Sequence, residues 1–418
     1  MGKLKVKSDF TKNVLTLMTG TTVAQAIPIA ISPILTRLYT PADFGVVALF
    51  MALVASFGSV ANGRYELAIM LPKKDEDAIN LFALSLIITT SISIVLFLIV
   101  LFLDDKIALW LGNKEVKIWL YFVPITVFFV GLYNSLDKYN TRQKNYKDIA
   151  KSKVVKSFVL ATVQLSIGFI KQGATGLVSG QILAQMFANL KLLKNIIKNK
   201  TLLEKISVDS IKAEAKRYIK FPKYSLGGVI ASSLSVHFIE ILISSFFSIA
   251  TLGFYALVQR ILGLPSSLIG GSIGQVFFQE ATQEKHRSGK AIEIYKKTFK
   301  KLLVLGTLFF GFLYFSVEDI FTFVFGQKWQ IAGLYAQILT PLFFIRFIYV
   351  SLSMTYDVFE SLKTELVWQV SYFLGLMALI YISKNGSFES FLHMFTIYGS
   401  IMYLISLYIT YHLAKGKE

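Results

Sequence analysis

Long apolar segments of about 20 or more residues recur along the whole chain, and they limit its possible folds more than any other feature. A helix of about 20 apolar residues crosses the ~30 Å hydrocarbon core of a bilayer. The chain is 54% hydrophobic and only 16% charged, whereas soluble domains carry about 25% charged residues. Short segments of alternating hydrophobicity, which a transmembrane β-barrel needs, are missing from the sequence. The sequence therefore predicts an all-α polytopic membrane protein.

Twelve such segments can be distinguished, six before and six after a polar stretch at 194–223 in the centre of the chain. We predict that this stretch is a basic cytoplasmic linker with a surface helix at 208–218. It would join an N-terminal six-helix bundle, 1–193, to a C-terminal six-helix bundle, 224–418. The predicted spans are 13–38, 41–71, 78–103, 118–137, 154–170, 174–193, 224–248, 250–279, 301–317, 330–356, 365–383 and 388–413.

One stretch of the first half returns in the second half. Ile31–Leu49 can be aligned without gaps to Ile239–Leu257, 208 positions later, and Gly45 then lies over Gly253. The offset is almost half of the chain and indicates a duplication, although chance similarity between two helical hairpins is an alternative. Because each half has an even number of spans, both halves would enter the membrane in the same orientation. We predict two pseudo-symmetric bundles with a cavity between them.

The distribution of lysine and arginine predicts the orientation of the chain. With the N-terminus in the cytoplasm, 32 of the 43 Lys and Arg residues fall in cytoplasmic segments, six outside and five within spans, when Lys191 and Lys301 at the cytoplasmic ends of two spans are counted with the cytoplasmic segments. An excess of this kind marks the cytoplasmic side, so we expect both termini to be cytoplasmic. The same distribution explains most of the net charge of +18, since the cytoplasmic segments would face anionic lipid. A role in binding nucleic acid is therefore not expected.

Charged residues inside the predicted spans are the candidate functional residues, because each costs about 2.5–3.5 kcal/mol to insert. Glu240 precedes the turn at Ile249 by nine residues and Arg260 follows it by eleven. At 1.5 Å per residue they lie at similar depths on adjacent helices, and we predict that they pair. The pair is either a proton-sensitive acid coupled to a substrate-binding cation or a static ion pair. His237 lies three residues before Glu240 and shares its face.

Four arginines and two glutamates in the spans favour an anionic substrate such as a phosphate or diphosphate. Arg346, near the middle of its span, is the best candidate to face a water-filled cavity. Arg37 lies near the outer end of its span, where snorkelling to the interface is the alternative. Arg64 and Glu66, two positions apart in a predicted helix, should point to different faces. The predicted roles are substrate binding for Arg37, Arg64, Arg260 and Arg346, and ion coupling for Glu66, His237 and Glu240.

Prolines inside spans should kink or break them, and Pro28 and Pro33 make the first span the predicted hinge. Ordinary helix packing is the alternative for both residues. The chain has no cysteine, and its four histidines show no metal-ligand spacing. Walker A and HExxH motifs are missing from the sequence. We therefore predict no metal, no cofactor and no enzymatic activity, with a membrane-embedded transferase as the open alternative.

Two segments in residues 13–80 carry a resemblance to a known family. NVLTLMTGTTVAQAIPIAISPILTRLYTPADFG and GRYELAIMLPKKDEDAINL resemble the Wzx-type O-antigen and polysaccharide flippases. These belong to the multidrug/oligosaccharidyl-lipid/polysaccharide (MOP) exporter superfamily. The segment RYELAIMLP, Arg64–Pro72, is similar to the polysaccharide branch in particular, and it matches Arg64 and Glu66 to that branch.

The resemblance implies a MATE-like carrier in the bacterial inner membrane. Its expected substrate is an undecaprenyl-diphosphate-linked oligosaccharide, the repeat unit of O-antigen or capsule, moved from the cytoplasmic to the periplasmic leaflet by an ion gradient. Membrane lipids, a polysaccharide polymerase and a chain-length regulator are the implied partners. A cation-coupled exporter of drugs or amphiphiles, from the same superfamily, is the main alternative.

Overall fold

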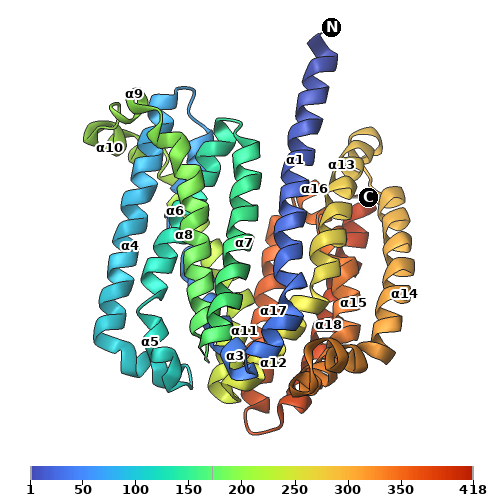
Figure 1. Ribbon diagram of the computed structural model, residues 1–418. Helices are drawn as coiled ribbons and strands as arrows, with labels where there is room; N and C mark the ends of the chain where they lie inside the picture. Colours follow the sequence, from blue (N-terminus) through green and yellow to red (C-terminus); the bar gives the residue numbers. More distant parts are fainter. Residues whose placement is uncertain (1, 172, 417–418) are drawn as a thin grey trace. The chain divides into compact units, whose positions relative to one another are not determined.

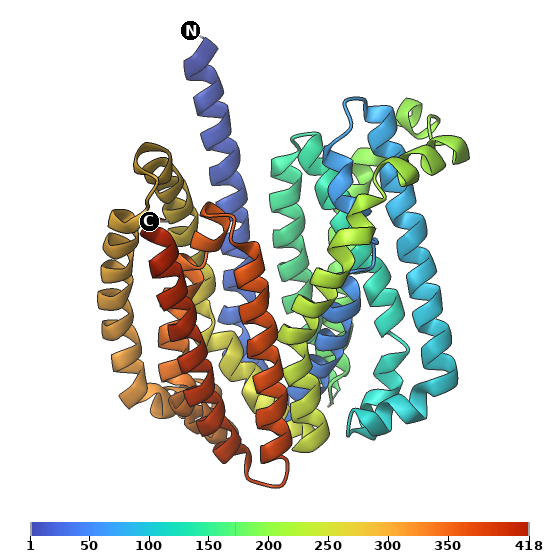
Figure 2. The ribbon, with the colours of Figure 1, turned by 180° about the vertical axis from the view of Figure 1, so that it is seen from behind.

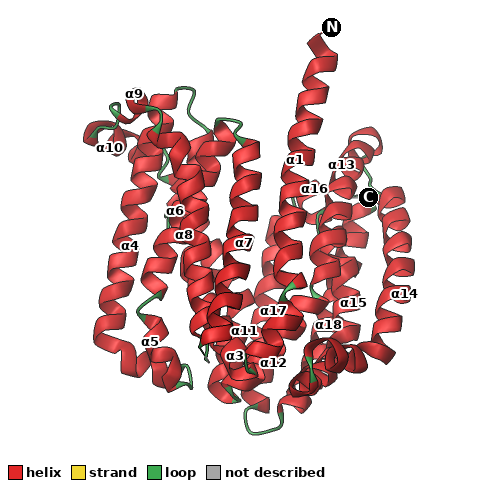
Figure 3. Ribbon diagram, in the orientation of Figure 1, coloured by secondary structure: helices red, strands yellow, loops and turns green. Residues whose placement is uncertain are grey.

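The computed structural model describes residues 2–171 and 173–416 and, among these, the side chains of 16–171, 173–230, 233 and 237–416. The described residues form helices joined by short loops and turns (Figure 3). They group into two compact units, Met1–Ile249 and Ala250–Glu418, called here the first and second units. The predicted turn between spans 154–170 and 174–193 includes Gln172, which lies outside the described residues. The all-helical class predicted from the apolar segments is confirmed.

The first unit contains most of the helices of the chain (Figure 1). Its elements are α1 (Gly2–Ala30), α2 (Ser32–Leu38), α3 (Pro41–Gly58), η1 (Tyr65–Met70), α4 (Asp75–Trp110), η2 (Lys114–Val116), α5 (Lys117–Leu120), α6 (Val123–Arg142), α7 (Tyr146–Ile170), α8 (Thr175–Ile197), α9 (Lys200–Leu203), α10 (Val208–Arg217) and α11 (Lys220–Phe246).

The second unit begins within the first turn of α12 and ends with α18 (Figure 2). Within it, α15 contacts both α14 and α18, and α17 also contacts α18. Its elements are α12 (Ile249–Leu262), η3 (Ser266–Gly270), α13 (Gly271–Ser288), α14 (Ile292–Phe325), η4 (Gln327–Trp329), α15 (Gln330–Leu352), α16 (Thr355–Val358), α17 (Leu362–Ser383) and α18 (Phe388–Ala414).

Eight helices in the described ranges are long and apolar enough to cross a membrane, or ten if two bent pairs each count as one span. The bent pairs are Lys114–Leu120 with Val123–Arg142, at 49°, and Ile249–Leu262 with Ser266–Ser288, at 42°. The second bend contains Pro265, one of the prolines inside a predicted span. The predicted segments 174–193 and 224–248 are helical but do not meet this measure. The count of twelve and the cytoplasmic termini stay predictions.

The repeated stretch Ile31–Leu49 forms a tight helical hairpin in the first unit. Its first helix is interrupted at Ile31, between Pro28 and Pro33, and its turn ends in a capping box. The Thr40 hydroxyl accepts a hydrogen bond from the Asp43 amide at 3.2 Å, and the Thr40 amide donates to the Asp43 carboxylate at 2.8 Å. Such a box satisfies backbone groups that a helix N-terminus leaves free. The sequence placed this turn correctly.

The compact units divide after Ile249, whereas the sequence predicts a division at the linker 194–223. The difference lies in α11, which packs on α3 of the first unit. Its end is also held by α4, because the hydroxyls of Ser244 and Ser245 donate to the carbonyl oxygens of Leu111 and Trp110, at 2.8 and 2.7 Å. This grouping does not test whether the spans are arranged as two bundles of six, which stays a prediction.

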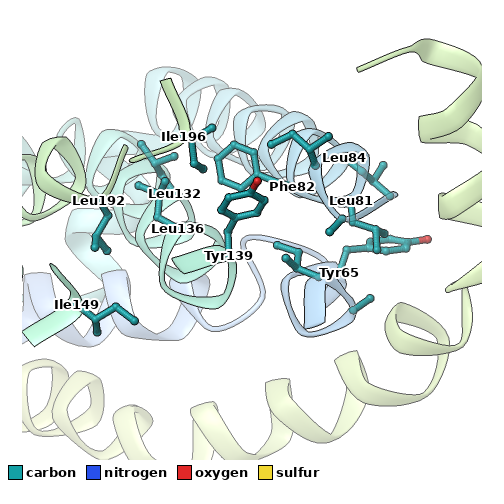
Figure 4. Packing of buried hydrophobic residues seen from close by; sticks show 14 residues of the cluster. Tyr65, Leu81, Phe82, Leu84, Leu132, Leu136, Tyr139, Ile149, Leu192 and Ile196 are labelled. Atoms are coloured by element: carbon teal, nitrogen blue, oxygen red, sulfur yellow. The ribbon is translucent and has the colours of Figure 1, made fainter. Parts of the chain in front are cut away.

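The core of the first unit is a cluster of apolar side chains from η1, α4, α6, α7 and α8 (Figure 4). The rings of Phe82 and Tyr139 lie 5.8 Å apart, between the other side chains of the cluster. Beside it, the buried Asn62 amide donates to Gly131 and Ser135 of α6, each at 2.8 Å. The Asn62 amide also donates to the Thr89 hydroxyl of α4 at 2.9 Å. These buried hydrogen bonds fix the irregular segment after α3 against α4 and α6.

The central linker folds back onto the first unit instead of extending as a free tether. Its helix α10 confirms the predicted surface helix, with bounds of 208–217. The Tyr65 hydroxyl donates to the Ala215 carbonyl at 3.0 Å, and the Ser207 amide donates to the Asn80 side chain at 3.0 Å. Burial, reinforced by the nearby Asp77, raises the pKa of the Glu214 carboxyl on α10. The linker is therefore docked by both apolar and polar contacts.

Candidate functional site

Arg64 and Glu66 form an ion pair, with 3.3 Å between Nη1 and Oε1. The prediction that they point to different faces is wrong, because it assumed an α-helix through this segment. The helix α3 ends at Gly58 instead of continuing to residue 71, and Gly63 and Arg64 adopt left-handed conformations with φ of +58° and +67°. A 3₁₀-helix, η1, then begins at Tyr65. The left-handed turn brings the two side chains together.

The Arg64–Glu66 pair is buried, and each residue has a side-chain polar atom without a hydrogen-bond partner among the described residues. The Glu66 side chain is 6% exposed, and among the described residues Glu66 Oε2 and Arg64 Nε have no hydrogen-bond partner. Burial raises the pKa of the Glu66 carboxyl, although Arg64 opposes this shift. Buried polar atoms without partners are unusual and mark a strained or functional place. The pair can therefore accept a further polar partner.

Arg142 fixes the loop that carries this pair. Its guanidinium donates to the Pro72 carbonyl at 2.7 Å and to the Asp75 carboxylate at 2.9 Å, and it also reaches the carbonyls of Ile69 and Met70. The Arg142 side chain is 12% exposed. These contacts join the end of α6 to the whole segment from η1 to α4. Arg142 is a positioning residue that the sequence analysis did not select.

We expect Arg142→Ala to lower the free energy of unfolding by about 2 kcal/mol, because hydrogen bonds to charged groups contribute about 1.5–3 kcal/mol. Arg142→Lys should retain part of this stability, since an ammonium reaches fewer acceptors than a guanidinium. Thermal unfolding of the purified protein in detergent measures both effects. The exposed Arg287 of the second unit supplies a matched control as Arg287→Ala. Equal stability of the two alanine variants would contradict this role.

The second unit holds its own candidate site around Arg346 on α15. Arg346 Nη1 donates to Gln259 Oε1 on α12 at 3.5 Å, and the Gln259 amide donates to the Tyr255 hydroxyl. The guanidinium carbon lies 5.5 Å from the centre of the Phe343 ring. Contact with a ring face offsets part of the cost of holding a cation among apolar groups. Arg346 is half-buried and is held in place from two helices.

An aromatic cluster from three helices adjoins Arg346. Tyr349 of α15 lies 4.7 Å from Tyr403 of α18 and 5.2 Å from Trp368 of α17, between ring centres. The Trp368 indole also donates to a backbone carbonyl at 2.8 Å. The cluster consists of Tyr349, Trp368, Tyr372, Tyr398 and Tyr403.

Two apolar grooves lie on the other side of α15, against α14. The larger, about 360 Å³, is lined by Pro265 in the break after α12, by Ile269 of η3 and by Phe347. The smaller, about 220 Å³, includes Phe344, and Phe310 lines both grooves. One face of α15 therefore carries the cation and the opposite face lines apolar space. Neither the grooves nor the aromatic cluster was predicted from the sequence.

The other predicted site residues are distributed between the two units. Arg37 is exposed near the end of α2, and Arg260 is half-buried in the last turn of α12. His237 Nδ1 lies 3.8 Å from Glu240 Oε2, so their shared face on α11 is confirmed. Glu240 belongs to the first unit and Arg260 to the second, and their pairing therefore stays a prediction.

The fold is similar to the folds of solved transporters and of a lipid flippase. The chain is similar to an inward-facing multidrug MATE family transporter of the MOP superfamily, with 12% identity, coverage of 94% and 93% of the two chains and a TM-score of 0.70. It is also similar to the lipid II flippase MurJ, with 13% identity, coverage of 96% and 87% and a TM-score of 0.68. A MOP superfamily transporter from Pyrococcus furiosus gives 13% identity, coverage of 96% and 94% and a TM-score of 0.62. At these identities the likeness concerns the fold.

Residues 34–333 match the family described as polysaccharide biosynthesis protein. Because the match covers most of the chain, the protein belongs to this family. The resemblance found in the sequence and the expected MATE-like fold are thereby confirmed. No curated protein matches the chain.

Proposed function

We propose that the protein is a flippase for a lipid-linked oligosaccharide. Its substrate is undecaprenyl diphosphate carrying an O-antigen or capsule repeat unit, which it moves from the cytoplasmic to the periplasmic leaflet of a bacterial inner membrane. The observation that carries this proposal is the grouping of a cation, an aromatic cluster and apolar grooves around α15. Such a substrate has three chemically different parts, namely a diphosphate, sugar rings and a prenyl chain.

Arg346 is the proposed ligand of the diphosphate. A guanidinium binds phosphate oxygens through two parallel hydrogen bonds and stays charged at all physiological pH values. Its present acceptor, Gln259 Oε1, is neutral and 3.5 Å away, a long and weak contact. An anionic oxygen would therefore compete well for this donor. Arg37, Arg64 and Arg260 are proposed as further phosphate ligands along the transport route.

The aromatic cluster is the proposed contact for the sugar rings. Tyr349, Tyr372 and Tyr398 are half-buried, so part of each side chain remains open. Tyrosine offers an apolar ring face and a hydroxyl on one side chain, which suits sugars with both apolar and hydroxyl-bearing faces. The grooves beside α14 supply apolar surface for the prenyl chain, since burial of such surface is favourable. In this proposal the lipid-linked oligosaccharide crosses the membrane chemically unchanged.

Alternating access would require one element to bend, and the break at Ile31 between Pro28 and Pro33 supports the first helical segment in this role. Glu66, His237 and Glu240 are the proposed ion-coupling residues. Glu240 is partly exposed, at 24% of its side chain, and lies beside His237. A carboxylate beside an imidazole within a membrane segment is a candidate for proton exchange during transport.

We expect Glu240→Gln to remove the dependence of transport on the proton gradient, because a glutamine cannot release a proton. The measurement is uptake of labelled lipid-linked oligosaccharide into proteoliposomes with and without an imposed pH difference. Glu204→Gln, an exposed acid of the linker, is the matched control and should behave as the unmodified protein. Transport by Glu240→Gln that still responds to the gradient removes Glu240 as the coupling acid.

Deletion of the gene tests the proposed substrate class in the cell. The proposal predicts loss of surface O-antigen or capsule and accumulation of lipid-linked repeat units on the cytoplasmic side. Expression of the unmodified protein should restore the surface polysaccharide. Normal surface polysaccharide in a clean deletion strain would exclude the proposed function.

A cation-coupled exporter of drugs or amphiphiles is the second candidate, favoured by the likeness to multidrug transporters. Four arginines among the predicted spans disfavour cationic drugs as substrates. Drug-resistance profiles of an overexpressing strain separate the candidates. Broad resistance with unchanged surface polysaccharide supports the exporter.

A further inference from the structure

A lateral pocket of about 310 Å³ lies between α14 and α18 in the second unit. It is separate from the grooves beside α15, and none of the predicted site residues lines it. Its lining contains one cation, Lys296, among aromatic and aliphatic side chains. The lining residues are Tyr295, Lys296, Phe299, Leu404, Leu407, Tyr408 and Tyr411.

The pocket is built by specific contacts between the beginning of α14 and the end of α18. The buried Tyr295 hydroxyl donates to the Leu407 carbonyl at 2.9 Å and lies 3.0 Å from the Thr410 hydroxyl. The Ala291 amide donates to the Ala414 carbonyl at 2.8 Å, which places the C-terminal end of α18 beside the start of α14 (Figure 2). These contacts hold the two helices in register around the pocket.

Positive charge is concentrated at one end of this pocket. Lys296 and Lys300 lie one helical turn apart, so they share a face of α14. The Lys415 ammonium lies 4.8 Å from the centre of the Tyr411 ring, at the end of α18. The carboxylate of Glu284 is already used, since it accepts from the backbone amides of the first turn of α14 at 3.1 and 2.9 Å. Within the first turn of α14, Glu293 is the one acidic residue, and it is exposed.

The chemistry of the pocket changes along α14. After Lys301 the helix continues as an apolar run from Leu302, which is where a membrane interface is expected. Deeper in the pocket, Phe299 is half-buried and Leu407 buried, whereas Leu404 and Tyr408 are 52% and 66% exposed. The pocket is thus open to the side, with Lys296 at its interfacial end and apolar side chains towards its membrane end. Lys300 lies one turn further along the same face of α14, at the edge of the pocket.

We propose that this pocket binds an anionic phospholipid of the surrounding bilayer. The acyl chain lies against Phe299, Leu404 and Leu407, and the phosphate is bound by Lys296 and Lys300. Anionic head groups are attracted to basic pockets between membrane helices on the cytoplasmic side. Tyr408 and Tyr411 supply the amphipathic rings found at that depth. The lipid would support the contact between α14 and α18 and does not depend on what the protein transports.

The test measures how much phosphatidylglycerol remains bound to the purified full-length protein, by native mass spectrometry, with phosphatidylcholine as the neutral comparison. The double variant Lys296→Gln/Lys300→Gln should lose phosphatidylglycerol by about tenfold and leave phosphatidylcholine unchanged. The matched control is Lys297→Gln/Lys301→Gln, which removes the same charge from another face of the same helix. This control should retain phosphatidylglycerol.

A second variant tests the apolar part with all lysines in place. Leu404→Trp adds bulk to the pocket and should also reduce phosphatidylglycerol binding. Equal losses in the two lysine double variants would mean general surface charge and would overturn the proposal. Retention of undecaprenyl diphosphate in place of phosphatidylglycerol would assign the pocket to the transported lipid and would also overturn it. Because lipid retention is measured without transport, loss of phosphatidylglycerol from the variants can be scored whether or not the protein is a flippase.

Discussion

Arg346→Ala is expected to reduce transport of lipid-linked oligosaccharide by about tenfold or more, since a charge-assisted contact to a buried phosphate contributes about 1.5–3 kcal/mol. The guanidinium lies 5.5 Å from the centre of the Phe343 ring and makes only a long, 3.5 Å contact with Gln259, which a phosphate oxygen can displace. Arg346→Lys keeps the positive charge but loses the paired donors, and it should keep part of the activity. Initial rates in proteoliposomes, at equal amounts of folded protein, measure both effects.

The control for this prediction removes an arginine from the same unit outside the site. Arg287 is exposed at the end of α13, and Arg287→Ala should transport as the unmodified protein does. Thermal unfolding of each variant separates loss of transport from loss of folding. If alanine and lysine at position 346 both support full rates, Arg346 has no role in transport.

Gly45→Ala should destabilise the protein by about 3 kcal/mol, because the added methyl group has no space. Gly45 lies in α3, within the repeated stretch Ile31–Leu49. A Cβ atom at this position would overlap the backbone carbonyl oxygen of Ile249, at the end of the first unit. A backbone atom cannot move aside as a side chain can, so α3 and the segment after α11 would have to separate.

Gly311→Ala is the matched control for this packing prediction. Gly311 lies within α14, and a Cβ atom there would have no described neighbour within 4 Å. Alanine is a better helix former than glycine by about 1 kcal/mol, so this variant should be neutral or slightly more stable. Thermal unfolding in one detergent compares the two variants directly. Similar unfolding temperatures for both would show that Gly45 is not a close helix contact.

The sequence predicted the helical class, the Thr40 turn and the α10 surface helix because each depends on local pattern. Apolar run length, the short break between two runs and the polar stretch of the linker are all visible within a few turns. The irregular segment after Gly58 was missed although it had a local signal. Asn62-Gly63 is a typical turn dipeptide, and its left-handed turn places Arg64 against Glu66.

The candidate site of the second unit could not be read from local pattern. Tyr349, Trp368 and Tyr403 come from three helices, and only tertiary packing brings their rings together. Arg346 was selected for its depth, but its partner Gln259 lies 87 positions earlier in the chain. The grouping of α11 with the first unit has the same origin, because it depends on contacts with α3 and α4.

The most direct test of the flippase assignment is relocation of a purified lipid-linked oligosaccharide between the leaflets of proteoliposomes containing only this protein. A saccharide-specific reagent that cannot cross the membrane reports which leaflet holds the substrate. The account predicts relocation of chemically unchanged substrate by the unmodified protein and a loss of about tenfold or more for Arg346→Ala. Absence of relocation by correctly folded protein, or release of a chemically altered product, would contradict it.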